Sequence, residues 1–309
     1  STETEVRMTE QFLNELKKIV RGDHIFEEEP MKKHTTFRVG GPADVLIQPD
    51  TEELKKVIRL CAQQGESCCV IGNGSNLLIG DKGIRGLVIE MLSVKDAIKI
   101  TGDTIRAGAG VLLSKTAMEA AKAGLSGMEF AAGIPGTIGG AVVMNAGAYG
   151  GEMKDILVSV TVLDEKGELR QIQAEDLNLG YRRSNIIENH YIVVEAVLKL
   201  KQGETSEILA QMDTLKQQRR EKQPLEYPSA GSTFKRPEGY FAGKLIMDAG
   251  LRGYQVGGAM VSEKHCGFVV NAGDATAADI RRLMQDVSDT VQEKFGVTLE
   301  PEVKMLGEF

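Results

Sequence analysis

Two glycine-rich segments contain the residues best suited to holding a ligand. The first is the turn Gly72-Asn73-Gly74-Ser75-Asn76, which Leu77 follows. Because glycine has no Cβ and tolerates positive φ, successive N–H groups of such a turn can point at one phosphate. Leu77 stands where a dinucleotide fingerprint has its third glycine, and the Gly-Lys-Ser/Thr ending of a P-loop is missing. The turn indicates an anion cradle, with an ordinary turn as the alternative.

The second segment, residues 131–151, has almost no side-chain volume. It contains Gly133-Ile134-Pro135-Gly136-Thr137-Ile138-Gly139-Gly140 and, further on, Asn145-Ala146-Gly147-Ala148-Tyr149. A core segment of this kind loses much entropy on folding and packs poorly. The segment therefore predicts a surface on which a flat or extended ligand lies against the backbone. A small-residue helix packed on a sheet is the alternative.

The composition excludes several classes of protein. Of the 309 residues, 42% are hydrophobic and 26% charged, which is typical of a globular protein with a substantial core. The formal net charge of −7 argues against a general nucleic-acid binder. No apolar run approaches the roughly 18 residues that span a bilayer. Neither the cysteines nor the histidines have metal-ligand spacing, so we expect a cytoplasmic protein with reduced thiols, no metal and no membrane insertion.

Local signals predict the elements that position the first turn. A short amphipathic helix is expected over 6–20. Asp50 as N-cap and Gly65 as terminator delimit a second helix. Cys68-Cys69-Val70-Ile71 predicts a short buried strand that leads directly into the glycine turn. With the extended stretch 36–48, these elements predict a βαβ-like unit.

The rest of the chain is predicted to be mixed. Hairpins are expected at 97–107 and 156–172, and a charged helix at 204–221. Prolines at 224 and 228 indicate a domain boundary after that helix. Beyond it we expect a strand at 264–271 and a helix that begins at a Thr276…Asp279 capping box and ends at Gly296. The predicted class is α+β, with at least two lobes.

Several motifs together resemble the UDP-N-acetylenolpyruvoylglucosamine reductase family. They occur in the family's order and span nearly the whole chain. The motifs are His34-Thr35-Thr36-Phe37-Arg38-Val39-Gly40-Gly41, the 72–76 turn, the 133–140 and 145–150 runs, Tyr181-Arg182, Ala230-Gly231-Ser232-Thr233-Phe234-Lys235 and Glu300-Pro301-Glu302-Val303.

The resemblance implies a fold and a division of the chain. The family has a two-subdomain FAD-binding fold of the vanillyl-alcohol-oxidase (PCMH) type, followed by a C-terminal α+β substrate-binding domain. On this chain we expect an N-terminal helix and lead-in at 1–34, an FAD-binding domain at 35–200 with subdomains 35–95 and 96–200, a linker helix at 201–222 and a substrate-binding domain at 223–309. The short segment from Tyr181 to Tyr191 leaves no room for an inserted tyrosine lid, so the loop-less type II subtype is expected.

The resemblance also implies an activity. NADPH reduces non-covalently bound FAD, and flavin N5 then passes a hydride to the enolpyruvyl alkene of UDP-N-acetylglucosamine enolpyruvate. The product is UDP-N-acetylmuramate, in peptidoglycan precursor synthesis, and the enzyme is expected to act as a monomer. Two alternatives stay open: an FAD-dependent sugar or alcohol oxidase of the same fold, and a non-catalytic nucleotide-binding protein.

Three residues match the catalytic positions of the family. Arg182 would stabilise negative charge on the enolpyruvyl carboxylate, because a guanidinium is a planar cation suited to that group. Ser232 would donate a proton to the substrate carbanion. Glu302 would pair with the arginine, polarise the carboxylate or relay a proton.

The resemblance implies two further sets of residues. The cofactor-binding set is Gly72, Asn73, Gly74, Ser75, Asn76, Leu77, Gly133, Ile134, Pro135, Gly139, Gly140, Asn145, Gly147, Ala148 and Tyr149. The substrate-binding set is Tyr181, Lys222, Lys235 and Arg252. For the second set, a solvated side chain is an equally good interpretation.

Overall fold

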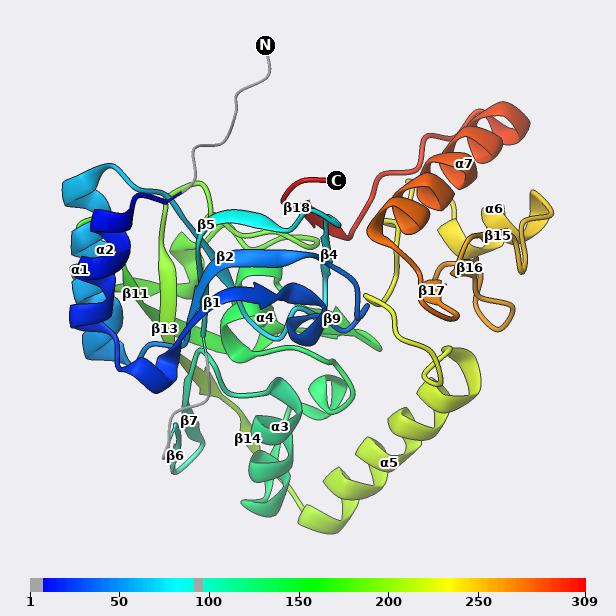
Figure 1. Cartoon of the computed structure of the whole chain (residues 1–309). Coiled ribbons are helices and arrows are strands. Elements are labelled where there is room, and N and C mark those ends of the chain that lie inside the picture. Colours follow the sequence, from blue (N-terminus) through cyan, green and yellow to red (C-terminus); the bar gives the residue numbers. More distant parts are fainter. Residues whose placement is uncertain (1–7, 92–96) are drawn as a thin grey trace.

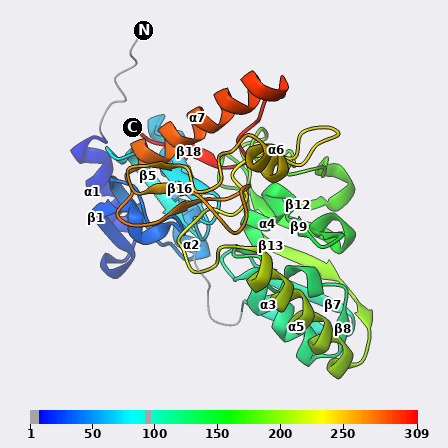
Figure 2. The same ribbon diagram turned by 90° about the vertical axis from the view of Figure 1, so that its right-hand side faces the viewer.

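The computed structural model describes residues 8–91 and 97–309. Figures 1 and 2 show two sheet-containing lobes with a more loop-rich C-terminal region above and beside them. The helices are α1 (Glu10–Ile19), α2 (Thr51–Gln64), α3 (Leu113–Lys122), α4 (Ile138–Met144), α5 (Thr205–Lys222), α6 (Ala242–Asp248) and α7 (Ala277–Phe295). None of the helices in these ranges combines the length and apolar character of a membrane-spanning segment. The start of the helix predicted at 6–20 and the subdomain boundary predicted at 95–96 both involve positions outside the described residues.

The first lobe is a mixed sheet covered on one face by α1 and α2. Its strands, in spatial order, are β1 (Ile25–Pro30), β2 (Pro42–Ile47), β5 (Ile84–Glu90) and β3 (Cys68–Ile71). Both β2 and β3 run parallel to β5, and β1 is antiparallel to β2. Phe12 and Leu16 of α1 and Leu54 and Val57 of α2 are fully buried in one hydrophobic cluster with the sheet. The βαβ-like unit is present, although β5 lies between its two strands.

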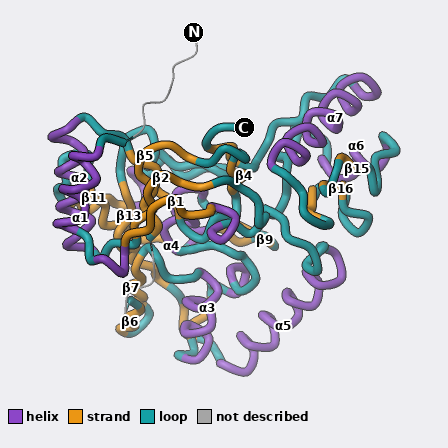
Figure 3. Tube along the Cα trace, in the orientation of Figure 1, coloured by secondary structure: helices purple, strands orange, loops and turns teal. Residues whose placement is uncertain are grey.

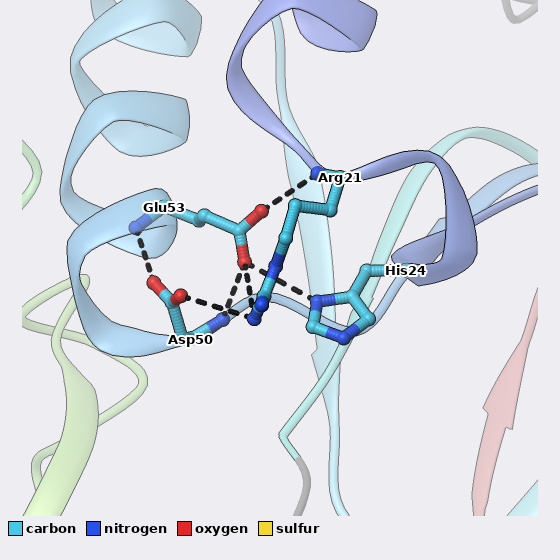
Figure 4. A network of polar contacts seen from close by, with 4 residues as sticks. All are labelled: Arg21, His24, Asp50 and Glu53. Atoms are coloured by element: carbon cyan, nitrogen blue, oxygen red, sulfur yellow. Dashed lines mark hydrogen bonds and ion pairs between the residues drawn. The ribbon is translucent and has the colours of Figure 1, made fainter.

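Both ends of α2 follow from its sequence. Asp50 and Glu53 form a capping box, and Gly65 ends the helix in the left-handed conformation. Figure 4 shows that Glu53 is the centre of a wider network: its carboxylate accepts hydrogen bonds from the backbone N–H groups of Arg21 (2.7 Å) and Asp50 (3.0 Å) and lies 3.3 Å from Nδ1 of His24. The cap therefore also fixes the chain where it enters β1.

The second lobe is an antiparallel sheet. Its strands, in spatial order, are β12 (Leu169–Gln173), β11 (Leu157–Leu163), β13 (Ile192–Lys199), β7 (Thr104–Gly108) and β6 (Ile98–Thr101). The pairs β6–β7 and β11–β12 confirm both predicted hairpins. Helix α4 packs on β13, so within 131–151 the small-residue helix is the correct interpretation for 138–144. Short pairs of strands accompany this sheet: β8 (Leu125–Ser126) with β14 (Lys201–Gln202), and β9 (Gly147–Ala148) with β10 (Gly151–Glu152).

The chain returns from its C-terminal region to the first lobe. Strand β4 (Leu77–Ile79) follows the glycine turn directly, and β18 (Lys304–Leu306) pairs with it in parallel. The C-terminal core also includes Phe37, Val39 and Leu78 from the first lobe. The two regions therefore share one hydrophobic cluster.

The C-terminal region contains α6, α7 and a three-stranded sheet of β15 (Gln255–Val256), β16 (Ala259–Val261) and β17 (Val269–Asn271). Helix α7 has the predicted Thr276–Asp279 capping box and the predicted Gly296 terminator. The strand predicted at 264–271 is wrong over 264–268, because the Ser262 hydroxyl accepts hydrogen bonds from the backbone N–H groups of Lys264 and His265 and turns the chain. Figure 3 shows the stretch between α5 and α6 as loop, and Figure 2 shows α5 beside α3.

Candidate active site

A cavity of about 920 Å³ lies between the β9–β10 region and the C-terminal region. Arg182, Ser232 and Glu302 all line it, although they come from three distant stretches of the chain. Tyr149, Tyr181, Arg236 and Phe241 are also among its lining residues; the last three of these come from outside the glycine-rich segments. The volume is within the range of roughly 300–1,000 Å³ that is typical of small-molecule sites.

Arg182 and Glu302 form an ion pair in this cavity. Nε of Arg182 lies 2.6 Å from Oε1 of Glu302, and Nη2 donates to the carbonyl of Gly147 at 3.3 Å. The side chains are 24% and 11% exposed, respectively. Arg182 has φ +52°, a conformation that is unfavourable for residues other than glycine and is often found at functional sites. The pairing fixes the guanidinium at the cavity wall.

Ser232 and Glu302 are positioned by the same short piece of backbone. Ser232 is exposed. The next residue, Thr233, is fully buried; its carbonyl accepts the N–H of Glu302 at 2.9 Å, and its own N–H donates to the carbonyl of Gly267 at 2.9 Å. The Thr233 hydroxyl also accepts the N–H of Val269 at 2.8 Å. The buried Thr233 therefore holds the backbone of Ser232, which precedes it, close to the backbone of Glu302.

Near each of Arg182, Ser232 and Glu302 the sequence has a second residue of the same type, and none of these second residues lines the cavity. Glu300 is 70% exposed in its side chain and pairs with Lys235 at 3.0 Å. The Ser229 hydroxyl accepts a hydrogen bond from the N–H of Gly231. Arg183 is exposed and is not among the residues that line the cavity.

The structure separates the predicted substrate residues into two groups. Tyr181 and Arg252 line the cavity, whereas Lys222 and Lys235 do not. Lysines and arginines that sequence reasoning missed also line it: Arg236, Lys244 and Lys264. Arg236 lies with Cζ 4.9 Å from the ring centroid of Phe241, which is 63% exposed. The basic character of this wall suits an anionic ligand.

His265 also lines the cavity, in the turn that replaces part of the predicted strand. Burial lowers its pKa, which favours the neutral ring. Its Nδ1 accepts the N–H of Gly267 at 3.0 Å, and its ring packs edge-on against Phe268. These contacts give His265 a structural role in shaping the wall.

The glycine turn has the unpaired donors that an anion cradle needs. Among the described residues, no protein acceptor receives the N–H groups of Asn73, Gly74 or Ser75. Gly74 is buried, and its carbonyl accepts the N–H of Thr36 at 3.2 Å. A Cβ on Gly72 would lie 2.5 Å from Oγ1 of Thr137, the N-cap of α4. The turn therefore packs closely against the second glycine-rich segment, and its free amides fit a phosphate group. Leu77, the last residue of this set, begins β4.

The second glycine-rich segment is partly used for packing within the protein. A Cβ on Gly139 would lie 3.0 Å from the Ala109 side chain, and one on Gly133 would lie 2.5 Å from the Arg219 guanidinium. By contrast, Gly147, Ala148 and Tyr149 line the cavity. The first part of the segment and α4 therefore pack against other parts of the protein, whereas the part after α4 lines the cavity.

Asn145 was predicted to bind cofactor, but its side chain contacts protein groups. It is 1% exposed. Its Nδ2 donates to Glu152 Oε2 (3.1 Å) and to the carbonyl of Gly180 (3.0 Å), and its Oδ1 accepts the N–H of Lys154 (2.8 Å). Both amide hydrogens are used, so Asn145 ties the cavity loop to the turn that carries Arg182. No local sequence signal marks this role.

Comparison with known proteins shows which class this architecture belongs to. Residues 42–173 match the family model of an FAD-binding domain. Residues 223–306 match the model of the C-terminal domain of UDP-N-acetylenolpyruvoylglucosamine reductase. The fold and site therefore define a flavoprotein that joins an FAD-binding domain to a specialised C-terminal domain.

Whole-chain relatives specify the family. A UDP-N-acetylenolpyruvoylglucosamine reductase of Agathobacter rectalis is 57% identical over 92% of this chain and 95% of its own. That of Caldanaerobacter subterraneus is 49% identical over 97% of this chain and 100% of its own. The crystal structure of the Thermus caldophilus reductase superposes with a TM-score of 0.77 at 40% identity, covering 90% of this chain and 97% of that one. The chain belongs to the UDP-N-acetylenolpyruvoylglucosamine reductase family.

Proposed function

We propose that this protein catalyses the NADPH-dependent reduction of UDP-N-acetylglucosamine enolpyruvate to UDP-N-acetylmuramate, a step of peptidoglycan precursor synthesis. Family membership favours this reaction over a sugar oxidase and over a non-catalytic nucleotide-binding protein. The geometric observation that supports it best is the gathering of Arg182, Ser232 and Glu302 around one cavity. We place the reaction in the cytoplasm and expect the enzyme to act as a monomer.

Bound FAD would supply the hydride carrier between NADPH and the enolpyruvyl alkene. We assign its phosphate groups to the free N–H groups of the 72–76 turn. The backbone of 133–149 would support the rest of the cofactor, with Tyr149 at the cavity end. The remaining chemistry falls to side chains of the chain itself.

Arg182 would stabilise the negative charge that develops on the substrate. When hydride adds to the terminal alkene carbon, the neighbouring carbon acquires charge that its carboxylate shares. A fixed guanidinium directed at that carboxylate lowers the barrier, since it needs no reorganisation during the reaction. Glu302 would hold Arg182 in place through the 2.6 Å contact.

Ser232 would complete the reaction as proton donor. Its exposed hydroxyl on the cavity wall is accessible to a substrate. Although a hydroxyl is a weak acid, a strongly basic carbanion at hydrogen-bond distance can take its proton. The proton would be replaced from solvent, to which the cavity opens.

The basic wall suits the substrate's diphosphate. Arg252 would contact it, with Arg236 and Lys264 as further candidates on the same wall. Lys235 pairs with Glu300, and neither Lys235 nor Lys222 lines the cavity. Either lysine would therefore attract the substrate from outside the cavity wall.

We also assign the chain to the loop-less type II subtype. In this subtype Tyr181, which is 55% exposed, borders an open site.

Anaerobic stopped-flow absorbance of the flavin tests this function by separating the two half-reactions. In Ser232→Ala, flavin reduction by NADPH should be unchanged, whereas reoxidation by the enolpyruvyl substrate should fall by about 10²–10⁴-fold. Ser229→Ala is the matched control and should leave both rates unchanged. Equal loss of both half-reactions in Ser232→Ala would contradict the proton-donor role, and a wild-type flavin that the substrate fails to reoxidise would contradict the function.

A further inference from the structure

Arg219, in the last turn of α5, has a buried guanidinium nitrogen without a partner. Its Nε donates to Oε1 of Gln223 at 3.0 Å. Its Nη1 is fully enclosed, and no acceptor for it exists among the residues that the structure describes. An unpaired buried donor on a charged group carries a desolvation cost that proteins normally avoid. The cost is understandable if a ligand supplies the missing acceptor.

The surroundings of Arg219 do not neutralise its charge. Burial lowers the pKa of the guanidinium, and Tyr149 is the one neighbouring group that opposes this shift. No carboxylate in the described ranges forms an ion pair with it. Because arginine stays protonated in proteins, a positive charge without a carboxylate partner lies at a half-buried position, with Nη1 enclosed.

The guanidinium lies directly against the second glycine-rich segment. A Cβ built on Gly133 would lie 2.5 Å from Nη1, 2.9 Å from Cδ and 3.3 Å from Cζ of Arg219. Any residue other than glycine at position 133 would therefore displace the arginine. The absence of a side chain at Gly133 allows the Arg219 guanidinium to lie against the backbone of the second glycine-rich segment.

We propose that Arg219 binds an electron-rich oxygen of FAD, with Nη1 as the donor. The inference rests on the FAD site assigned above and adds a residue from outside the segments that form it. Two kinds of oxygen in the cofactor have the required chemistry: the diphosphate oxygens and the carbonyl oxygens of the isoalloxazine ring. Arg219 thus links the helix that precedes the C-terminal region to cofactor binding.

The affinity of FAD for the apoprotein tests the proposal. Arg219→Gln should weaken FAD binding by about 10- to 100-fold, because a hydrogen bond from a charged donor is lost. Arg220→Gln is the matched control: the neighbouring arginine is exposed, and its removal changes the net charge equally. Flavin fluorescence titration of both variants and the wild type gives the comparison.

The thermal stability of the apoproteins separates ligand binding from a structural role. Removing an unpaired buried charge should leave apo Arg219→Gln at least as stable as the wild-type apoprotein, while FAD raises its melting temperature less. A variant whose apoprotein is destabilised and whose FAD affinity is unchanged would overturn the proposal. A wild-type protein that does not bind FAD would instead overturn the proposed function.

The midpoint potential of the bound flavin identifies which oxygen is bound. A guanidinium at the ring carbonyl stabilises the reduced, more negative ring, so the potential of Arg219→Gln would fall below that of the wild type. An unchanged potential, together with weaker FAD binding, would place the contact at the diphosphate. Unchanged affinity and unchanged potential would exclude any contact between Arg219 and FAD.

Discussion

The side-chain amide of Asn76 donates a hydrogen bond to the main-chain carbonyl of Glu302 at 3.2 Å, across 226 positions of sequence. Asn76 is the last residue of the glycine turn, and its own carbonyl accepts the N–H of Lys304. The turn predicted to hold phosphate and the carboxylate predicted to hold Arg182 are therefore parts of one connected structure. A change at the turn is expected to reach the reaction site.

Asn76→Ala tests this connection. Loss of the amide frees the Glu302 backbone, and because small misplacements of catalytic groups are costly, turnover per bound flavin should fall by about 10- to 100-fold. Asn189→Ala is the control, because Asn189 is an exposed asparagine outside both the turn and the cavity lining. Turnover should be measured after correction for flavin content, and equal turnover in the two variants would show that Asn76 does not position Glu302.

Gly74→Ala should destabilise the protein and weaken FAD binding. A Cβ at this position would lie 2.0 Å from the carbonyl oxygen of His34, and φ is +64°. The turn or the 34–36 segment must move, and either change disturbs the free amides. Gly65→Ala is a closely matched control, with φ +65° and no atom within 4 Å of the added Cβ.

The Gly65→Ala control separates the cost of the positive φ from the cost of the steric clash with His34. Gly65→Ala should cost about 1 kcal/mol for its unfavourable φ alone. Gly74→Ala should cost clearly more in chemical denaturation and should also lose FAD more readily. If both variants lose equal stability and keep FAD equally well, the contact with His34 is unimportant.

Glu53→Gln should lower the free energy of unfolding by about 1–3 kcal/mol at pH 7, because hydrogen-bond donors around the carboxylate lose their charged acceptor. Burial by itself would raise the pKa of Glu53, but hydrogen bonds from Asp50, Arg21 and His24 together hold it below the ordinary value of 4.5. This stabilisation is therefore present above pH 4.5 and is lost as the pH falls through the lower folded-state pKa.

Urea unfolding of the wild type and Glu53→Gln between pH 3.5 and 7 measures the effect. The difference between them should shrink toward the acid end. Glu52→Gln, an exposed neighbour in the same helical turn, should differ little from the wild type at every pH. A constant difference for Glu53→Gln across this range would contradict the assigned cause.

His34→Gln should destabilise the protein most at mildly acidic pH. Nδ1 of His34 lies 2.6 Å from Glu90 and Nε2 lies 2.9 Å from Glu29. Glu90 is the main cause that raises the pKa of His34 above 6.5, with Glu29 contributing and burial opposing. The charged ring therefore contributes stability that is fully present below pH 6.5 and is lost as the pH rises through the higher folded-state pKa.

Melting temperatures from pH 5.5 to 9 provide the measurement. The wild type should exceed His34→Gln by the equivalent of about 1.5–3 kcal/mol near pH 6, with a smaller margin at high pH. His190→Asn is the control, because His190 is exposed and asparagine tolerates its positive φ of 54°. A margin that grows with pH would show that the neutral ring is the stabilising form.

Elements with strong local signals were predictable from the sequence. The Asp50 and Thr276 caps and the Gly65 and Gly296 terminators delimit α2 and α7 as expected, since capping depends on residues within one helical turn. The strand expected over 264–268 failed because a single side chain, Ser262, takes two backbone N–H groups. The hydropathy pattern does not show that a side chain will bind backbone N–H groups in place of a strand partner.

The site depends on contacts between distant residues. No local pattern brings Arg182 to Glu302 or selects Glu302 over Glu300; only the resemblance to a family made those assignments. The hydrogen bonds of the Asn145 side chain and the unpaired Nη1 of Arg219 were not predicted, because an asparagine after a small-residue helix and an arginine in a charged helix are common surface features. The burial of Asn145 and of the Nη1 atom of Arg219 becomes evident only when the lobes are assembled.

The pairing of β18 with β4 has a consequence for biosynthesis. Residues 304–306 lie beside the strand that leaves the glycine turn, and Glu302 belongs to the same returning segment. On the ribosome, the N-terminal lobes emerge first, yet the site stays unfinished until translation has passed Leu306. Completion of the site therefore follows formation of the N-terminal lobes, and chains that stop before this returning segment would be inactive even where most of their fold has formed.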